Sequence, residues 1–176
     1  MDGHFTGYAS LFGVPDLGRD VVMPGAFAAS LRRRGAAGVR MLWQHDPAEP
    51  IGCWLSLAED ARGLRVEGRL NLAVQRAREI DALLRAGGLD GLSIGFRTLE
   101  ARPGGGLRQL RAVDLWEVSL VTFPLQPGAR IASAPRPAEL RAFARRLAPA
   151  RLAPARAARP RADPAPRVTP SSAPHR

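Results

Sequence analysis

The sequence predicts one mainly β (α+β) domain with two helices, followed by a tail of different composition. Several short runs alternate apolar and polar residues, as half-buried strands do, and two segments carry apolar residues on one helical face. From residue 132 the composition changes to Ala, Pro and Arg, and residues 132–176 hold nine of the 16 prolines. A chain of 176 residues is long enough for one domain with a core and too short for two ordinary domains.

The predicted elements follow one another with turn signals between them. In the first half we expect strands over 5–12, 21–25 and 39–44, a short helix over 26–34, a turn at Asp46-Pro47, and an antiparallel pair over 51–57 and 64–70. In the second half we expect a helix over 72–86, capped by Asn71 and stopped by Gly87. Strands over 92–100 and 107–121 then flank a three-glycine turn, and the second is expected to break near Asp114.

The net charge of +10 is concentrated in the tail. Residues 132–176 hold ten of the 26 basic residues against Glu139 and Asp163, so the tail carries +8 and the body +2. Such a segment buries too little apolar surface to offset the entropy lost on ordering it. We therefore expect one short helix within 132–147 and disorder over 148–176.

Composition also bears on location and on cofactors. No apolar stretch approaches the roughly 20 residues that span a bilayer, and no signal segment opens the sequence, so we expect a cytoplasmic protein that does not enter membranes. Cys53 is the single cysteine, which excludes an internal disulfide and argues against a zinc site. We expect neither a metal nor a cofactor.

Residues 91–96, Gly-Leu-Ser-Ile-Gly-Phe, hold a serine between two glycines at the start of a strand-like run. Ser93 can act as a nucleophile only if a base takes its proton, and a histidine is the usual base. His4 and His175 lie near the chain ends, where geometry is usually not fixed, whereas His45 follows a predicted strand. His45 is therefore the candidate base. The alternative is an ordinary strand serine and a surface imidazole.

The Gly-x-Ser-x-Gly pattern does not indicate an α/β-hydrolase. In that fold a helix follows the serine, and the histidine comes last along the chain. Here a strand is predicted after Ser93, and His45 precedes the serine. The order of the residues therefore argues against a lipase or an esterase.

Glu117 is the candidate for a third member of the site. Strict alternation places it on one face with Ser119 and with apolar neighbours, where a carboxylate without a partner would be costly. Its partner is expected to be either one of the arginines or the imidazole of His45. In the second case three strands would bring together Ser93 as nucleophile, His45 as general base and Glu117 as the group that orients the imidazole.

Other residues remain open as alternatives. Asp114 is the reserve for the third position, whereas Asp46 should point away from His45 because neighbouring side chains in an extended chain alternate. A pair of Cys53 with His45 is conceivable, although a buried structural cysteine is the more usual case. The donors of an oxyanion hole cannot be assigned, and backbone amides are the default expectation.

Five blocks occur in order between residues 5 and 131: GYASLFG (7–13), VMPGAF (22–27), WQHD (43–46), GLSIGF (91–96) and WEVSLV (116–121). Together they resemble the successive blocks of the HK97-type prohead (capsid maturation) proteases of tailed phages. Gene transfer agents carry similar proteases, and this short, arginine-rich chain resembles those as well.

The resemblance implies a protease domain over 1–131 with the assemblin fold of herpesviruses, a mainly antiparallel β-barrel flanked by helices. It implies a serine endopeptidase with His45 as base and Ser93 as nucleophile, and with Glu117 where assemblins use a second histidine. It also implies a homodimer inside the assembling procapsid, which cuts the scaffolding segment from the major capsid protein and commonly digests itself.

Two other functions remain as alternatives. The basic tail could bind nucleic acid through phosphate contacts, but it contains a single aromatic residue, Phe143, and the body is nearly neutral, so nucleic-acid binding is not expected. A catalytically inactive capsid assembly or scaffold protein would keep the same fold. In the protease hypothesis, the tail could bind acidic scaffold surface inside the shell.

Overall fold

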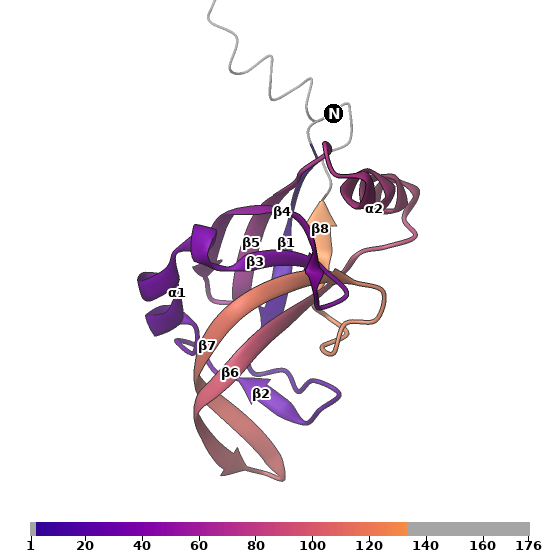
Figure 1. Ribbon diagram of the computed structural model, residues 1–176. Coiled ribbons are helices and arrows are strands. Elements are labelled where there is room, and N and C mark those ends of the chain that lie inside the picture. The colour runs from indigo at the N-terminus through magenta and orange to yellow at the C-terminus, as the bar shows by residue number, and fades with distance from the viewer. Residues whose placement is uncertain (1–2, 134–176) are drawn as a thin grey trace, which may run out of the picture.

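The computed structural model describes residues 3–133, which form a curled sheet flanked by two helices (Figure 1). The helices are α1 (Ala28–Arg34) and α2 (Gln75–Ala86), and a short 3-10 helix covers Ala36–Gly38. The eight strands are β1 (His4–Leu11), β2 (Asp20–Val22), β3 (Arg40–Trp43), β4 (Asp46–Glu59), β5 (Gly63–Leu70), β6 (Gly91–Gly104), β7 (Leu107–Val121) and β8 (Ile131–Ser133). The predicted mainly β domain with two helices is confirmed.

The sheet is mixed, so the expectation of an antiparallel sheet was only partly right. Its strand order is β2-β7-β3-β4-β5-β1-β8, and β6 pairs with β7 on the other side. β2 pairs with residues 108–110 of β7 and β3 with residues 117–120, both in parallel, while the other pairs are antiparallel. From β2 to β3 the chain therefore follows one edge of β7 in a single direction. It leaves this edge between the two strands, where α1 and the 3-10 helix form.

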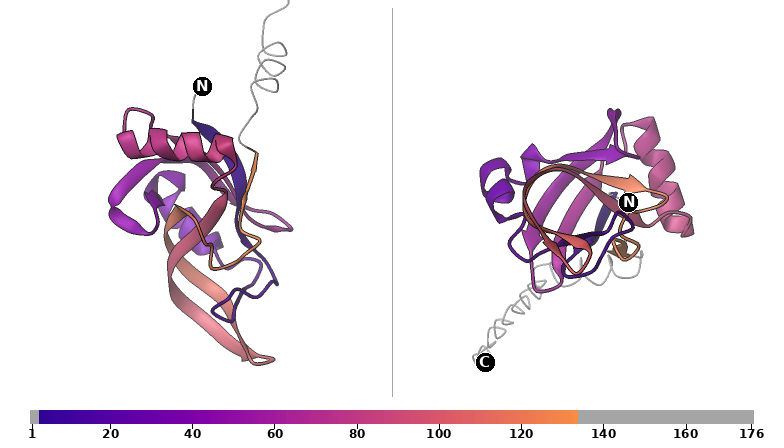
Figure 2. Two further views of the ribbon diagram at one scale, coloured as in Figure 1. Left: turned by 90° about the vertical axis from the view of Figure 1, so that its right-hand side faces the viewer. Right: turned by 90° about the horizontal axis from the view of Figure 1, so that it is seen from below.

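The sheet curls into a half-barrel, which is seen along its axis in the right-hand view of Figure 2. Residues 129–131 link its two sides. The amide of Tyr8 in β1 donates to Arg130 O at 3.0 Å, and the amide of Leu92 in β6 donates to Ala129 O at 3.0 Å. Ile131 N also donates to Asp90 O at 2.8 Å. A short segment near the end of the domain therefore holds β1 beside the start of β6.

The core lies inside the curl, and β5 shows how the sequence specifies it. Leu64, Val66, Gly68 and Leu70 are buried, and the charged residues between them point outward, as the predicted alternation requires. At Gly68 an added Cβ would come within 2.8 Å of the Trp54 ring, so only glycine leaves room for the indole. The largest fully buried side chains include Phe5, Phe27, Met41, Ile51, Ile80, Leu92, Leu110, Leu115 and Leu120.

Helix α1 begins at Ala28, two residues later than predicted, because a distant side chain orders the preceding turn. The Glu59 carboxylate on β4 accepts hydrogen bonds from Gly25 N at 3.1 Å and Phe27 N at 2.8 Å. These donors would otherwise lack partners at the start of a helix. The local sequence does not reveal this cap, because it comes from 32 residues further along the chain.

Helix α2 begins at Gln75 rather than at residue 72, and the predicted N-cap is wrong. Asn71 uses its side chain to accept a hydrogen bond from Ala73 N at 3.1 Å, which stabilises a turn before the helix, and Val74 occupies the N-cap position. The predicted C-terminal stop is confirmed, since Gly87 has φ 74°.

Three further expectations concern the long strand, the tail and membrane-spanning helices. β7 is continuous past Asp114, but a bulge lies next to it, since Gly95 pairs with Glu117 and Phe96 with Leu115. β8 ends at Ser133, and the helix and the disorder expected further on lie outside the described residues. Within residues 3–133, no helix is long and apolar enough to cross a membrane.

Candidate functional site

His45 is carried on a two-residue turn between β3 and β4. Trp43 pairs with Asp46, so only Gln44 and His45 connect the strands, and their φ angles are 51° and 62°. Positive φ at both loop residues is the signature of a type I′ hairpin turn, and it is uncommon outside glycine. The expected Asp46-Pro47 turn is therefore wrong: the reversal comes just before it, and Asp46 begins β4.

The end of β7 holds this turn in place. Gln44 N donates to Leu120 O at 3.0 Å, and the Gln44 side chain donates to Thr122 Oγ1 at 2.7 Å. His45 N donates to Ser119 Oγ at 3.1 Å. Because β3 runs beside β7 in parallel, the His45 turn comes to lie next to Ser119.

The imidazole of His45 is paired with Glu117. His45 Nδ1 lies 2.6 Å from Glu117 Oε1, and the two side chains are 44% and 12% exposed. An ionised carboxylate can only accept, so Nδ1 is the donor and Nε2 of the neutral ring carries the free lone pair. The hydrogen bond to Glu117 raises the pKa of His45 above its ordinary value of 6.5, although partial burial opposes this. Of the two partners expected for Glu117, the structure has His45.

Ser93 shares a face of the sheet with this pair. Ser93 is the strand partner of Ser119, and Gly95 is the partner of Glu117. Residues directly opposite each other in an antiparallel pair point to the same side. Ser93 is 7% exposed, and among residues 3–133 no hydrogen bond joins it to His45. Ser93 and His45 each adjoin Ser119.

Ser119 is a member of this cluster that the sequence analysis did not identify. It is fully buried, and its hydroxyl donates to Glu117 Oε2 at 2.6 Å while it accepts from His45 N. The one available signal was the alternation that puts Ser119 on the same face as Glu117. That signal could not show that a turn from another strand would reach the hydroxyl.

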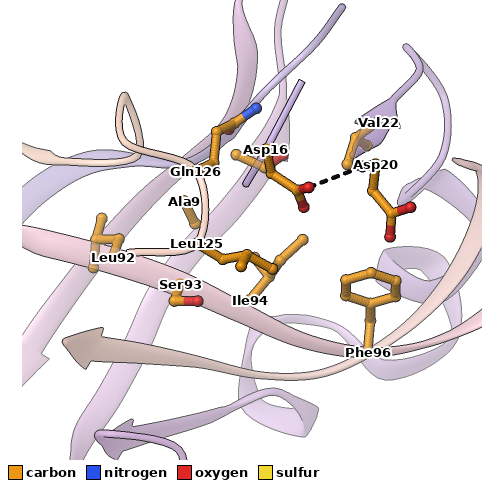
Figure 3. A pocket seen from close by; sticks show the side chains of 11 residues that line it. Ala9, Asp16, Asp20, Val22, Leu92, Ser93, Ile94, Phe96, Leu125 and Gln126 are labelled. Carbon is orange, nitrogen blue, oxygen red and sulfur yellow. Dashed lines mark hydrogen bonds between the residues drawn. The ribbon is translucent and has the colours of Figure 1, made fainter. Parts of the chain in front are cut away.

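A pocket lies beside Ser93, between β6 and β1. Figure 3 shows Ser93 on β6 and, across the pocket, Asp16 with its carboxylate hydrogen-bonded to Asp20 N at 2.8 Å. Apolar side chains make up most of the remaining wall: Ala9, Val22, Leu92, Ile94, Phe96 and Leu125.

Asp114, the reserve for the third position, has other partners. It is 4% exposed and binds Arg33 and both Nε and Nη2 of Arg34, the latter two at 3.0 Å, and it accepts from Trp116 Nε1 at 2.9 Å. These bonds, led by that of Arg34, hold the pKa of Asp114 well below its ordinary range. No hydrogen bond among the described residues joins Asp114 to His45; it ties α1 to β7 instead.

Two expectations about other reactive side chains were wrong. Cys53 is exposed on β4 rather than buried, because it points outward between the buried Ile51 and Trp54. His4 is not in a frayed end: it begins β1, and its Nε2 lies 2.8 Å from Glu67 Oε1. In the part of the chain that the structure describes, no three His, Cys, Asp or Glu side chains gather where they could share a metal ion.

A buried serine, a partly exposed imidazole on a turn and a largely buried carboxylate, gathered at adjoining strands, are the parts from which a serine-type hydrolytic site is built. The sequence profile described as caudovirus prohead serine protease matches residues 1–142. The chain belongs to this family, as the five sequence blocks led us to expect.

Individual relatives agree with this assignment. The chain is 36% identical over 137 residues to the prohead protease of Enterobacteria phage HK97, a match that covers 74% of this chain and 60% of that protein. It is 34% identical over 128 residues to the capsid polyprotein of Pseudomonas phage PAJU2, covering 68% of this chain and 18% of that protein. The chain thus spans about three fifths of the length of the HK97 relative.

The fold also resembles that of a herpesvirus protease. The crystal structure of the KSHV protease in complex with a hexapeptide phosphonate inhibitor superimposes with a TM-score of 0.53 at 13% identity, covering 82% of this chain and 75% of that one. At this level of identity the similarity concerns the fold alone. The expectation of an assemblin-like fold is confirmed to that extent.

Proposed function

We propose that the chain is a serine endopeptidase with Ser93 as nucleophile, His45 as general base and Glu117 as the residue that orients the imidazole. The observation that carries this proposal is the 2.6 Å hydrogen bond between His45 Nδ1 and Glu117 Oε1, on the face of the sheet that bears Ser93. Membership of a family of serine proteases supports the same roles.

The proposed mechanism follows from the hydrogen bond between His45 Nδ1 and Glu117, which leaves Nε2 to act as the base. Ser93 Oγ attacks the carbonyl carbon of the scissile peptide bond while His45 Nε2 takes the hydroxyl proton. The tetrahedral intermediate then collapses, and the imidazolium gives that proton to the departing amine. Water repeats the two steps on the acyl-enzyme and releases Ser93. Glu117 remains ionised throughout and stabilises the imidazolium that forms twice in each cycle.

Ser93 and His45 lie on either side of Ser119, and no hydrogen bond within residues 3–133 joins them. The proposed mechanism requires this hydrogen bond to form when the substrate binds, as catalytic hydrogen bonds commonly do.

We further propose that the substrates are the scaffolding segment of the major capsid protein and the chain itself, cut inside the assembling procapsid by a homodimer. Family membership supports a role in prohead maturation. A relative named a capsid polyprotein matches this chain over 18% of its own length, which supports a close association between such a protease and capsid protein.

The test is to express the chain together with the major capsid protein of its own genome and to measure the intact masses of both products. Wild type should shorten the N-terminus of the capsid protein, Ser93→Ala should not, and Ser56→Ala, which removes an exposed hydroxyl from β4, should cut like wild type. Cleavage by Ser93→Ala would refute Ser93 as the nucleophile. If no form cuts and the full-length chain stays with the shell, the inactive scaffold protein becomes the better description.

A further inference from the structure

The hydrogen bonds around His45 form a closed ring of three residues. His45 Nδ1 donates to one oxygen of Glu117, Ser119 Oγ donates to the other oxygen, and His45 N donates back to Ser119 Oγ, at 2.6, 2.6 and 3.1 Å. Ser119 has no exposed surface, so water does not compete for its hydroxyl. A hydroxyl has one proton to give, and here it goes to Glu117 while a lone pair accepts the amide.

This ring of hydrogen bonds holds both the imidazole and the backbone of His45. Glu117 alone would set the direction of the imidazole, but the backbone of His45 has φ 62°, a conformation that a non-glycine residue keeps only when its surroundings enforce it. The bond from His45 N to Ser119 acts on that backbone. The bond from Ser119 to Oε2 prevents the Glu117 carboxylate from rotating away from Nδ1.

We propose that Ser119 is a positioning residue of the catalytic pair: its buried hydroxyl holds the Glu117 carboxylate and the backbone of His45 in one arrangement, so that Nε2 is presented to the face that bears Ser93. Ser119 does not touch the reacting atoms and acts through His45 and Glu117. This inference rests on the proposed peptidase function, but the arrangement of His45 can be measured independently of cleavage.

The domain provides a matched control in Ser30. Ser30 is also buried, with 1% of its surface exposed, and it also bridges a β7 carboxylate and a β7 backbone amide. It accepts from Leu115 N at 2.9 Å and donates to Asp114 Oδ1 at 3.5 Å. Ser30→Ala therefore removes a buried hydroxyl that lies on α1 and makes the same two kinds of hydrogen bond to β7, at Asp114 and Leu115 instead of beside His45.

The first measurement is an NMR titration of the full chain labelled in its histidines, with the His45 signals assigned by their loss in His45→Gln. In Ser119→Ala we expect the His45 midpoint to fall toward 6.5 and the Nδ1 proton signal to be lost, because the freed carboxylate leaves the imidazole. Ser119→Thr keeps the hydroxyl and should retain the wild-type values. Ser30→Ala should retain them too.

The second measurement is the rate of peptide cleavage. The rate is divided by the concentration of active sites, which is counted from the protein that a fluorophosphonate labels. Ser119→Ala should lower kcat by about tenfold or more with KM within about twofold, because the base is misplaced while peptide binding is not affected. Ser30→Ala should lower the melting temperature but leave kcat per site unchanged. Ser119→Thr should recover most of the lost activity.

The outcomes separate the two proposals. If Ser119→Ala lowers stability as Ser30→Ala does and leaves both the His45 titration and kcat unchanged, Ser119 is merely structural and the inference is wrong. If wild type neither reacts with the fluorophosphonate nor cleaves, but its His45 signals respond to Ser119→Ala, the peptidase proposal fails while the positioning of His45 by Ser119 is supported.

Discussion

The carboxylate of Glu117 lies directly over Gly95, its partner on the neighbouring strand. A Cβ built at Gly95 would overlap Glu117 Oε1, at well under the 3.0 Å that real Cβ contacts keep. The second glycine of the Gly-x-Ser-x-Gly pattern therefore has a role unrelated to any sharp turn at the serine. It leaves room for the carboxylate that binds His45.

Gly95→Ala should disable the site without unfolding the domain. The added methyl group meets the far end of a flexible side chain, so the carboxylate can move aside, and it then loses His45 Nδ1. We expect cleavage to fall by up to about 10⁴-fold, the loss that removal of a triad carboxylate causes, and the melting temperature to change little. Gly88→Ala, whose Cβ would find its nearest neighbour at 3.7 Å, is the control and should behave as wild type. Normal activity of Gly95→Ala would count against Glu117.

Glu117→Gln should change the dependence of activity on pH. In wild type, kcat/KM should rise with pH as His45 loses its proton, with a midpoint above 6.5 because the hydrogen bond to Glu117 raises the pKa of His45. Without the negative charge the midpoint should move down toward 6.5, and kcat should fall by about 100-fold or more. Glu67→Gln, which alters the other His–Glu pair, should leave the pH profile unchanged.

The same pair should contribute to stability in a pH-dependent way. Because the pKa of His45 is higher in the folded than in the unfolded chain, its contribution is fully present below 6.5 and is lost as the pH rises through the folded value. The difference in melting temperature between wild type and Glu117→Gln should therefore shrink as the pH is raised. A difference that grows with pH would contradict the pairing.

Asp114→Asn should weaken the fold and leave the chemistry intact. Its depressed pKa means that the carboxylate stabilises the domain above pH 3.8 and loses this effect as the pH falls through the folded value. At neutral pH the variant should melt several degrees lower, because the amide replaces a charged acceptor for Arg33 and Arg34. Its kcat per reactive site should match wild type. Full stability with lost activity would instead make Asp114 part of the site.

Cys53 should be reactive and dispensable. Because the residue is exposed on β4, iodoacetamide should alkylate it in the folded protein, as a mass increase would show. Cleavage should survive both this treatment and Cys53→Ser. Loss of activity in both cases would revive the thiol alternative.

Part of the candidate site could be predicted from the sequence. The alternation along β7 was enough to place Glu117 and Ser119 on one face and to require a partner for the carboxylate. It could not decide between His45 and an arginine. That choice depends on β3 running parallel to β7, and strand pairing between segments some 75 residues apart leaves no local pattern.

Each misplaced boundary has an identifiable physical cause. At α1 the cap comes from Glu59, and at α2 the Asn71 side chain stabilises a turn where capping of the helix was expected. The hairpin at Gln44 and His45 was missed because neither residue is the Gly, Asn or Asp that usually marks a type I′ turn. At α1 and at the His45 turn a tertiary contact outweighs a local preference, whereas at α2 one local use of the Asn71 side chain replaces another.

Residues 129–131 also set a limit on how far the chain could shorten itself. Cleavage beyond Ser133 removes none of the hydrogen bonds described above. Cleavage before Ala129 would remove the backbone bridge between β1 and β6, and with it the support for the strand that carries Ser93. A protease that digests itself would thus pass from trimming to self-inactivation over only a few residues, so the position of the cut would decide whether the enzyme persists.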